Sequence, residues 1–315
     1  MSSIITNNSA MSALSTLRNI NNNLNTTQDR ISTGLKVSSG KDNAAYFAIS
    51  ETMKGDSGMT KAVNESLTLT KNSVATARLG AEQFSDLATE FRDKVAFAQE
   101  NKGGLDEIEA DLTRLVADMG AILSQSTFNG DDLVNAGGKQ TDGTTDASGD
   151  SSFTAAGVYA AEGTASGAAA ERTVITGVSR DSAGNLTTTS IKVAPVDLNA
   201  QKEMFRAIAD GFSGKAGSAT GEAYLSAVLT KADEATKATV DAATSLGQSE
   251  KSIERQQEFL TKLSDNLDSG VGAMVDANME EEAARLQALQ VQQQLASQSL
   301  SIANQAPQNI LSLFR

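Results

Sequence analysis

Two short segments contain residue types that could do chemistry. Residues 211–216, Gly-Phe-Ser-Gly-Lys-Ala, are superficially similar to a glycine-rich loop that cradles phosphate with backbone amides and a lysine. The spacing is wrong for such a loop, and Ala216 stands where a hydroxyl that binds Mg²⁺ is required. We therefore predict no phosphate site in this segment.

The second segment is a run of three carboxylates, Glu280, Glu281 and Glu282. Carboxylates can act as a general acid and base or bind a metal, but consecutive residues of a helix point in different directions. We interpret the run as a solvated or interface-facing charged surface. The sequence therefore predicts no catalytic residue, no metal site and no cofactor.

The composition of the 315-residue chain also argues against an enzyme. It contains no cysteine and no histidine, so it lacks the thiolate nucleophile, the imidazole base and the commonest transition-metal ligands. A carboxylate-only active site is the alternative that this composition leaves open. The net charge of −13, without a basic stripe, argues against nucleic acid. No stretch approaches the roughly 20 apolar residues of a membrane span, and the first residues do not resemble a signal peptide.

Charged residues are nearly absent from both ends of the sequence. Residues 286–314 carry none, and residues 1–28 carry only Arg18. Uncharged, amide-rich helices with a weak apolar stripe are poor helices in isolation, so we expect them to order when neighbouring copies cover them. This pattern predicts that the two ends come together and form a buried assembly surface.

Heptad periodicity connects these ends to the interior of the chain. One apolar seam runs from Val63 to Ala98, a second follows Gly103-Gly104 from Leu105 to Ile122, and a third runs from Leu225 to Leu267. A core of an ordinary helical bundle gives the same signal, but the length of the first and third seams favours coiled-coil-like rods. Weaker seams in the two ends define the predicted polymerisation interface, which consists of Leu14, Leu17, Leu24, Ile31, Leu35, Leu286, Leu289, Ala296, Leu300, Ala303, Ile310 and Leu313.

The middle of the chain has a different character. Residues 136–170 are rich in Gly, Ala, Ser, Thr and Asp, which is typical of a surface loop. Residues 173–178 and 189–193 flank the turn segment 181–185 and predict a β-hairpin. Of the two prolines, Pro195 closes the hairpin, and Pro307 is expected to interrupt the last helix.

A joint between helices is predicted at residues 39–45, Ser-Gly-Lys-Asp-Asn-Ala-Ala. Gly40 is expected to end the preceding helix, and Asp42 or Asn43 to cap the next one. A plain loop between helices is the alternative. The expected fold is mainly α, with long rods of paired N- and C-terminal segments and a small β or irregular central domain. The expected domains are 1–42 with 272–315, 43–135 with 196–271, and the surface-exposed region 136–195.

Three motifs resemble the bacterial flagellins. Residues 28–45, from Gln-Asp-Arg-Ile-Ser-Thr-Gly-Leu to Asp-Asn-Ala-Ala, are similar to their N-terminal signature. Residues 126–130, Ser-Thr-Phe-Asn-Gly, resemble the end of their N-terminal rod, and residues 301–315 resemble their C-terminus. The resemblance covers about residues 1–130 and 200–315, and Tyr46-Phe47 suggests the alphaproteobacterial type.

The resemblance implies a structural subunit of the helical filament used for swimming. It implies export of the unfolded chain by the flagellar type III apparatus with an export chaperone, and folding under a cap protein at the filament tip. The implied partners are copies of the chain, the cap protein and hook–filament junction proteins, and the implied location is the extracellular filament. A hook–filament junction protein of the same export class is the alternative.

The resemblance also bears on recognition by the animal innate-immune flagellin receptor. Recognised flagellins carry Arg-Val-Arg-Glu-Leu-Ala-Val-Gln on the N-terminal rod, and residues 90–97 correspond to this stretch. Arg92 keeps the second arginine of this stretch, and Asp93 keeps the negative charge of its glutamate. Glu90 stands in place of the first arginine and reverses its charge, and Lys94 stands in place of the apolar leucine. We expect weak recognition, although Glu90 and Lys94 also have the spacing of a simple surface ion pair.

Overall fold

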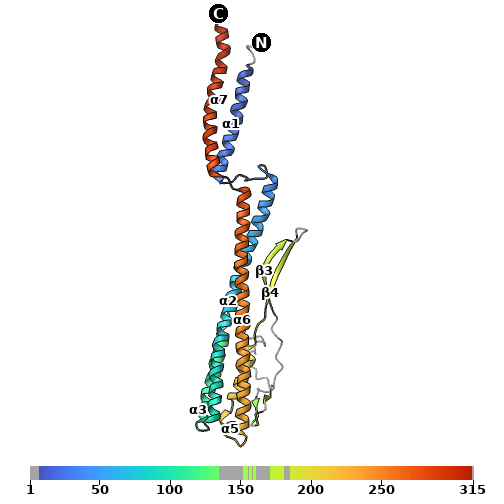
Figure 1. The fold of residues 1–315 in the computed structure, drawn as a ribbon, viewed down its shortest axis with the longest axis vertical. Helices are drawn as coiled ribbons and strands as arrows, with labels where there is room; N and C mark the ends of the chain where they lie inside the picture. The colour runs from blue at the N-terminus through green and yellow to red at the C-terminus, as the bar shows by residue number, and fades with distance from the viewer. Residues whose placement is uncertain are drawn as a thin grey trace. The chain divides into compact units, whose positions relative to one another are not determined.

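The computed structural model describes residues 7–134, 152–154, 156–157, 159–160, 171–180 and 185–313, which form mainly helices (Figure 1). The predicted fold class is confirmed, because long helices dominate and the strands form two antiparallel pairs, β1–β2 and β3–β4. In chain order the elements are α1 (Asn8–Thr33), α2 (Ala44–Glu100), α3 (Leu105–Gln125), β1 (Ser152–Phe153), β2 (Tyr159–Ala160), β3 (Arg172–Arg180), β4 (Leu186–Val193), α4 (Leu198–Ala209), α5 (Phe212–Ala216), α6 (Gly221–Val275) and α7 (Met279–Leu313).

The chain divides into two compact units. One comprises Met1–Gly58 with Leu263–Arg315, and the other comprises Met59–Lys262. Both α2 and α6 continue from one unit into the other, so the division falls within helices rather than in loops.

Within the unit Met59–Lys262, α2 and α6 pack together along the first and third predicted seams. Side chains tie the two helices directly: for example, Arg78 Nε donates to Glu250 Oε2 at 2.6 Å, and Thr236 Oγ1 lies 3.3 Å from the Ala88 carbonyl oxygen. The seams are confirmed by the burial of Leu67, Val74, Ala77, Ala81, Phe84, Ala88, Phe91, Val95 and Ala98 on α2, and of Leu225, Val228, Ala232, Ala235, Leu246, Ile253 and Leu260 on α6.

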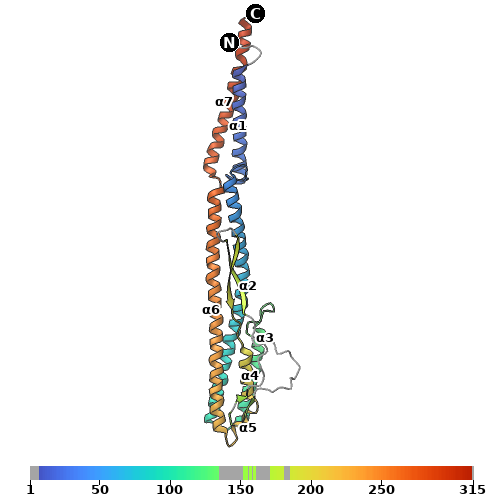
Figure 2. The same ribbon diagram turned by 90° about the vertical axis from the view of Figure 1, so that its right-hand side faces the viewer.

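The predicted break after the first seam is also present. Gly104 adopts the left-handed conformation with φ +83° between α2 and α3, a backbone geometry that favours glycine. Beyond it, α3 lies beside α4 (Figure 2), and the second seam buries Ile108, Leu112, Leu115 and Met119.

The segment similar to a phosphate loop forms α5, a helix of only 5 residues. The backbone amide of Ser213 donates to Glu109 Oε2 of α3 at 2.8 Å. A carboxylate of the protein therefore already uses the amide that an anion would need.

The predicted hairpin is confirmed by the antiparallel pairing of β3 with β4. A register shift between Ile175 and Gly177 leaves the Thr176 carbonyl free to accept a hydrogen bond from Gln256 Nε2 of α6 at 2.9 Å. Gln256 occupies a core position of the third seam, and it uses this position to hold the hairpin on α6. Of the predicted turn, only Asn185 lies within the described residues, and most of the predicted loop 136–170 lies outside them.

The motif at 126–130 forms a tight turn that is fixed to its surroundings. Phe128 and Asp131 exchange two backbone hydrogen bonds of 3.1 and 2.9 Å, and Asn129 and Gly130 both have positive φ, as in a type I′ turn. Asp131 Oδ2 accepts from Ser73 Oγ of α2 at 2.5 Å and pairs with an arginine of β3. The motif follows α3, and Asp131 directly after it ties this turn to α2 and β3.

A close approach of α2 to the end of α3 depends on Gly80. A Cβ atom at this position would lie 1.9 Å from Ser126 Oγ and 2.5 Å from Ser126 Cβ. Glycine inside a helix costs about 1 kcal/mol relative to alanine, so its presence here is explained by the contact that it permits.

The predicted interruption of the last helix at Pro307 is wrong. Helix α7 continues through this residue to Leu313. Proline lacks the N–H that would bond to the carbonyl four residues earlier, which is that of Ala303. This carbonyl instead accepts a hydrogen bond from Asn7 Nδ2 at 2.8 Å, so the loss is compensated from outside the helix.

Candidate functional site: the terminal helix pair

Helices α1 and α7 lie side by side and antiparallel (Figures 1 and 2). Three polar contacts mark the pairing: Asn7 with Ala303 at one end, Gln293 Nε2 with Asn21 Oδ1 at 2.7 Å in the middle, and Arg30 with Glu282 at the other end. In an antiparallel pair with one constant register, the two residue numbers of every contact add up to the same value, and these three sums are nearly equal. The two helices therefore keep one register along the length of α1.

The predicted interface residues lie mainly in the seam between these two helices. The seam buries Ile20, Thr27 and Leu289, and it half-buries Leu17, Leu24, Ile31, Leu286, Ala296, Leu300 and Ala303. Most of the predicted set therefore pairs the two ends of one chain with each other.

Four of the predicted residues lie elsewhere. Leu35 packs beside Val37 and Val275 in a small apolar cluster after α1, and Leu14 is 37% exposed on α1. Ile310 and Leu313 belong to the last turns of α7, and their side chains lie outside the described part of the chain.

A second apolar row, which we call the outer row, consists of Val291, Leu295 and Ile302 on α7. Their spacing of four and seven residues places them within about 40° of one another around the helix. They are 55%, 60% and 68% exposed, and the seam residue Leu300 lies on the opposite side of α7, about 140–180° away. Met11 of α1 is likewise 64% exposed. Helix α7 is therefore apolar on two opposite sides, of which α1 covers one.

The sequence-based interface missed the outer row because it followed a single heptad seam. A search for a second set of apolar residues at spacings of four and seven would have found it. Next to the pair, an open groove is lined by small side chains of both helices, among them Ser12, Ala13, Thr16, Ala296 and Ser299. These small residues leave room for side chains of another molecule.

The base of the pair contains a partly buried ion pair. Arg30 Nη1 lies 3.2 Å from Glu282 Oε1, and the two side chains are 25% and 7% exposed. Within the described part of the chain, Glu282 Oε2 is buried and has no hydrogen-bond partner. The charge of this carboxylate is therefore balanced mainly by Arg30, with Arg285 farther away at 3.8 Å.

The other two glutamates of the run belong to the start of α7. Asn278 Oδ1 accepts from the backbone amides of Glu280 and Glu281 at 3.1 and 3.4 Å, and both glutamate side chains are exposed. The interpretation as a solvated or interface-facing surface thus fits Glu280 and Glu281, whereas Glu282 faces Arg30.

At the predicted joint, Gly34 rather than Gly40 ends α1. Gly34 has φ +72°, and its amide donates to the Arg30 carbonyl, which is a typical left-handed helix end. The expectation for Gly40 was wrong because a glycine in the required conformation already stands six residues earlier. Asn43 caps α2, because its Oδ1 accepts from the amides of Ala45 and Tyr46, both at 3.1 Å.

Asp42 organises the loop of this joint. Its Oδ2 accepts from the backbone amides of Ser38 and Ser39, both at 3.0 Å, and from their hydroxyls at 3.1 and 3.2 Å. These hydrogen bonds, led by that of the Ser38 amide, lower the pKa of Asp42 below its ordinary value of 3.8. Since the pKa is lowered in the folded loop, the loop gains stability above pH 3.8 and loses it as the pH falls through the lowered pKa.

We therefore expect Asp42→Asn to loosen the loop at neutral pH, because a neutral amide accepts hydrogen bonds more weakly than a carboxylate. Hydrogen exchange of the Ser38 and Ser39 amides should become faster. Asp29→Asn on the exposed surface of α1 is the matched control and should leave both amides unchanged. Equal exchange in Asp42→Asn and the native chain would contradict this role.

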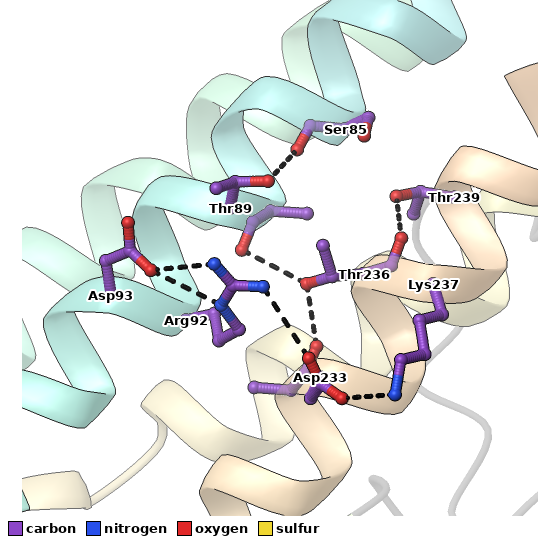
Figure 3. Close-up of polar contacts among 10 residues, drawn as sticks. Ser85, Thr89, Arg92, Asp93, Asp233, Thr236, Lys237 and Thr239 are labelled. Carbon is purple, nitrogen blue, oxygen red and sulfur yellow. Dashed lines mark hydrogen bonds and ion pairs between the residues drawn. The ribbon is translucent and has the colours of Figure 1, made fainter.

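The segment that corresponds to the immune-receptor motif lies on α2 at the contact with α6 (Figure 3). Arg92 lies between Asp93, at 3.0 Å, and Asp233 of α6, at 3.6 Å. Lys237 lies 2.6 Å from Asp233 and is the main cause of the lowered pKa of this carboxyl, with a smaller contribution from Arg92.

The surface ion pair considered for Glu90 and Lys94 is wrong. Among the described residues, Lys94 pairs with Asp111 of α3, because α3 folds back along this part of α2, and Glu90 is exposed. The hydrogen bond and charge of Lys94 lower the pKa of Asp111.

Two classes of site are absent from the described residues. No helix there is long and apolar enough to cross a membrane. No group of three acidic, histidine or cysteine residues in the same part of the chain could hold a metal ion.

Comparison with known proteins places both ends of the chain in one family. The model of the bacterial flagellin N-terminal helical region matches residues 4–138, and that of the C-terminal helical region matches residues 229–314. Relatives include Flagellin of Brucella melitensis biotype 1, 34% identical over 319 residues, and Flagellin C of Rhizobium meliloti, 34% identical over 326 residues. Flagellin A of Rhizobium meliloti is 32% identical over 395 residues, and all three alignments cover 100% of both chains.

These full-length relatives confirm the resemblance on which the sequence-based prediction depended, including the alphaproteobacterial type. None of the three carries the name of a hook–filament junction protein. The chain belongs to the bacterial flagellins, the structural subunits of the flagellar filament.

Proposed function

We propose that this flagellin polymerises by burying the outer row of α7 against a neighbouring copy of the chain. The observation that carries the proposal is that α7 has apolar rows on two opposite sides, and α1 covers only one of them. Exposed apolar side chains that form a contiguous row are typical of an interaction surface.

The absence of charge supports a second copy as the partner. Residues 286–314 contain no charged side chain, so neighbouring copies can approach without burying an unpaired charge. Burial of a leucine or isoleucine side chain stabilises an interface by about 1.5–3 kcal/mol. The half-buried seam of the α1–α7 pair gains little by itself, so ordering of the terminal helices is coupled to assembly.

The test replaces Leu295 of the outer row. Leu295→Lys should prevent growth on filament seeds, because an unpaired charge in a packed interface costs several kcal/mol. Leu295→Met keeps an apolar side chain of similar volume and is the matched control, which should grow nearly normally. Filament length and yield are measured by electron microscopy and sedimentation, and normal growth of Leu295→Lys would refute the proposal.

The remaining parts of the chain have proposed roles of their own. Residues 1–42 with 272–315 form the inner part of the filament, residues 43–135 with 196–271 form the rod, and residues 136–195 form the exposed outer region. The apolar rows on two opposite sides of α7 support the assignment of residues 1–42 with 272–315 to the inner part of the filament. The chain acts by assembly and not by catalysis.

Family membership supports the proposed route to the filament. The chain passes unfolded through the flagellar export apparatus with a chaperone, folds under the cap protein outside the cell, and meets the hook through junction proteins. Terminal helices that gain stability only from neighbours suit a chain that must stay unfolded until it reaches the filament tip.

We also propose that the receptor segment makes this flagellin a weak ligand of the innate-immune receptor. Arg92 is engaged with Asp93 and Asp233, Lys94 is charged and pairs with Asp111, and Glu90 presents an exposed negative charge. A reversed charge repels a complementary partner and slows the encounter, and loss of an apolar anchor removes further affinity.

A receptor-reporter assay with monomeric protein tests this expectation. The native chain should be far less potent than a recognised flagellin, and Glu90→Arg combined with Lys94→Leu should raise its potency. Glu100→Arg on the same helix makes the same charge change as Glu90→Arg alone, but outside the segment, and should change little. Potency of the native chain equal to that of a recognised flagellin would contradict the expectation.

A further inference from the structure

We propose that Asn7 is a positioning residue that fixes the register of the terminal helix pair by completing the hydrogen bonding of both helices at once. The two polar atoms of its side-chain amide serve different helices. Oδ1 accepts from the Ala10 amide at 3.0 Å and so caps the beginning of α1. Nδ2 donates to the Ala303 carbonyl of α7 at 2.8 Å.

The Ala303 carbonyl needs this donor because of the residue four positions later. Inside an α-helix, each carbonyl accepts from the backbone N–H four residues on, and for Ala303 that residue is Pro307, which has no N–H. Ala303 is half-buried against α1, so water has limited access to it. Asn7 supplies the missing donor, and α7 continues past the proline to Leu313.

The match between the two residues selects one alignment of the helices. Before the last turn of α7, Ala303 is the residue whose carbonyl lacks its backbone donor, because Pro307 is the only proline in the described helix. The matching donor is the side-chain amide of Asn7, the residue that caps the beginning of α1. Sliding either helix by one turn, about 5.4 Å, would separate the donor from its acceptor, whereas the small and apolar seam residues tolerate such a shift far better. The polar match thus specifies a register that the seam alone specifies weakly.

This inference rests on the proposed role of the terminal helices in assembly, and its test uses the soluble concentration that remains in equilibrium with seeded filaments. Asn7→Asp keeps the oxygen that caps α1 but cannot donate to Ala303. In the native background it should raise this critical concentration about tenfold, as expected for one buried carbonyl left without a partner. In the Pro307→Ala background, residue 307 supplies the N–H itself, so the same Asn7→Asp change should raise the critical concentration by less than about twofold.

Two outcomes would overturn the inference: no effect of Asn7→Asp in the native background, or an equal effect in both backgrounds. Asn23→Asp, on the exposed surface of α1, is the charge control, and a loss as large as that of Asn7→Asp would attribute the effect to charge and also overturn it. Leu295→Lys, measured in parallel, separates this inference from the proposed function. If Leu295→Lys fails to assemble while Asn7→Asp assembles normally, only the role of Asn7 is wrong, and if Leu295→Lys assembles normally, the proposed assembly surface is wrong.

Discussion

Arg30→Ala should release α1 from α7 at the base of the terminal pair and raise the critical concentration of filament growth by about a hundredfold or more. Glu282 is only 7% exposed, and its Oε1 faces Arg30 at 3.2 Å. Removing the guanidinium leaves the buried carboxylate with only the more distant Arg285, at 3.8 Å, and loss of one partner of a buried ion pair typically costs about 3–5 kcal/mol. The measurement is the equilibrium soluble concentration above sheared filament seeds.

Glu282→Gln is the matched control for this prediction. It removes the buried charge and keeps the shape of the side chain, and Arg30, which is 25% exposed, retains access to water. We therefore expect a much smaller loss than in Arg30→Ala. Equal losses in the two variants would show that the contact contributes through packing and would contradict the electrostatic explanation.

The second large effect is expected at Gly80. In Gly80→Ala the new Cβ would lie 1.9 Å from Ser126 Oγ and 2.5 Å from Ser126 Cβ, so the end of α3 must move away from α2. Ser126 cannot easily turn aside, because its Oγ also donates to the Ile122 carbonyl at 2.6 Å. We expect a loss of about 3 kcal/mol in the free energy of unfolding of the monomer, at the upper end for an overpacked site.

Gly120→Ala provides the comparison for Gly80→Ala. Gly120 also lies within a helix of the unit Met59–Lys262, and its new Cβ would meet only the flexible end of Lys202 at 3.8 Å. This variant should be stabilised by about 0.5–1 kcal/mol, because alanine is the better helix former. Both changes are measured by urea unfolding followed by circular dichroism, and a neutral Gly80→Ala would contradict the close approach of the two helices.

The sequence predicted the long helices well because heptad periodicity is a local property of the chain. Phe84, Phe91 and Leu246 fall on seams that can be read directly from their spacing, and each is fully buried. The hairpin could also be predicted from the sequence, because strand-forming residues flank a turn segment. The break at Gly104 could be predicted as well, because Gly103-Gly104 separates two seams in the sequence itself.

The errors concern interactions between distant parts of the chain. Pro307 does not end α7 because a side chain some three hundred residues away satisfies the carbonyl that it leaves free. Lys94 pairs with Asp111 because α3 returns along α2, a fact that no spacing within α2 contains. The outer row was missed because one helix can carry two apolar rows, and a single heptad register describes only one of them.

The uncharged stretch from Leu286 to Phe314 has a consequence for the environment in which a filament can work. It contains no group that titrates and no ion pair that salt can screen, so contacts made by the outer row should depend little on acidity or ionic strength. The strength of hydrophobic contacts of this kind depends on temperature instead, and it falls on cooling. A cell that swims from fresh water into brine, or from neutral into acidic surroundings, would thus change the fields around the charged rod and leave these contacts as they were.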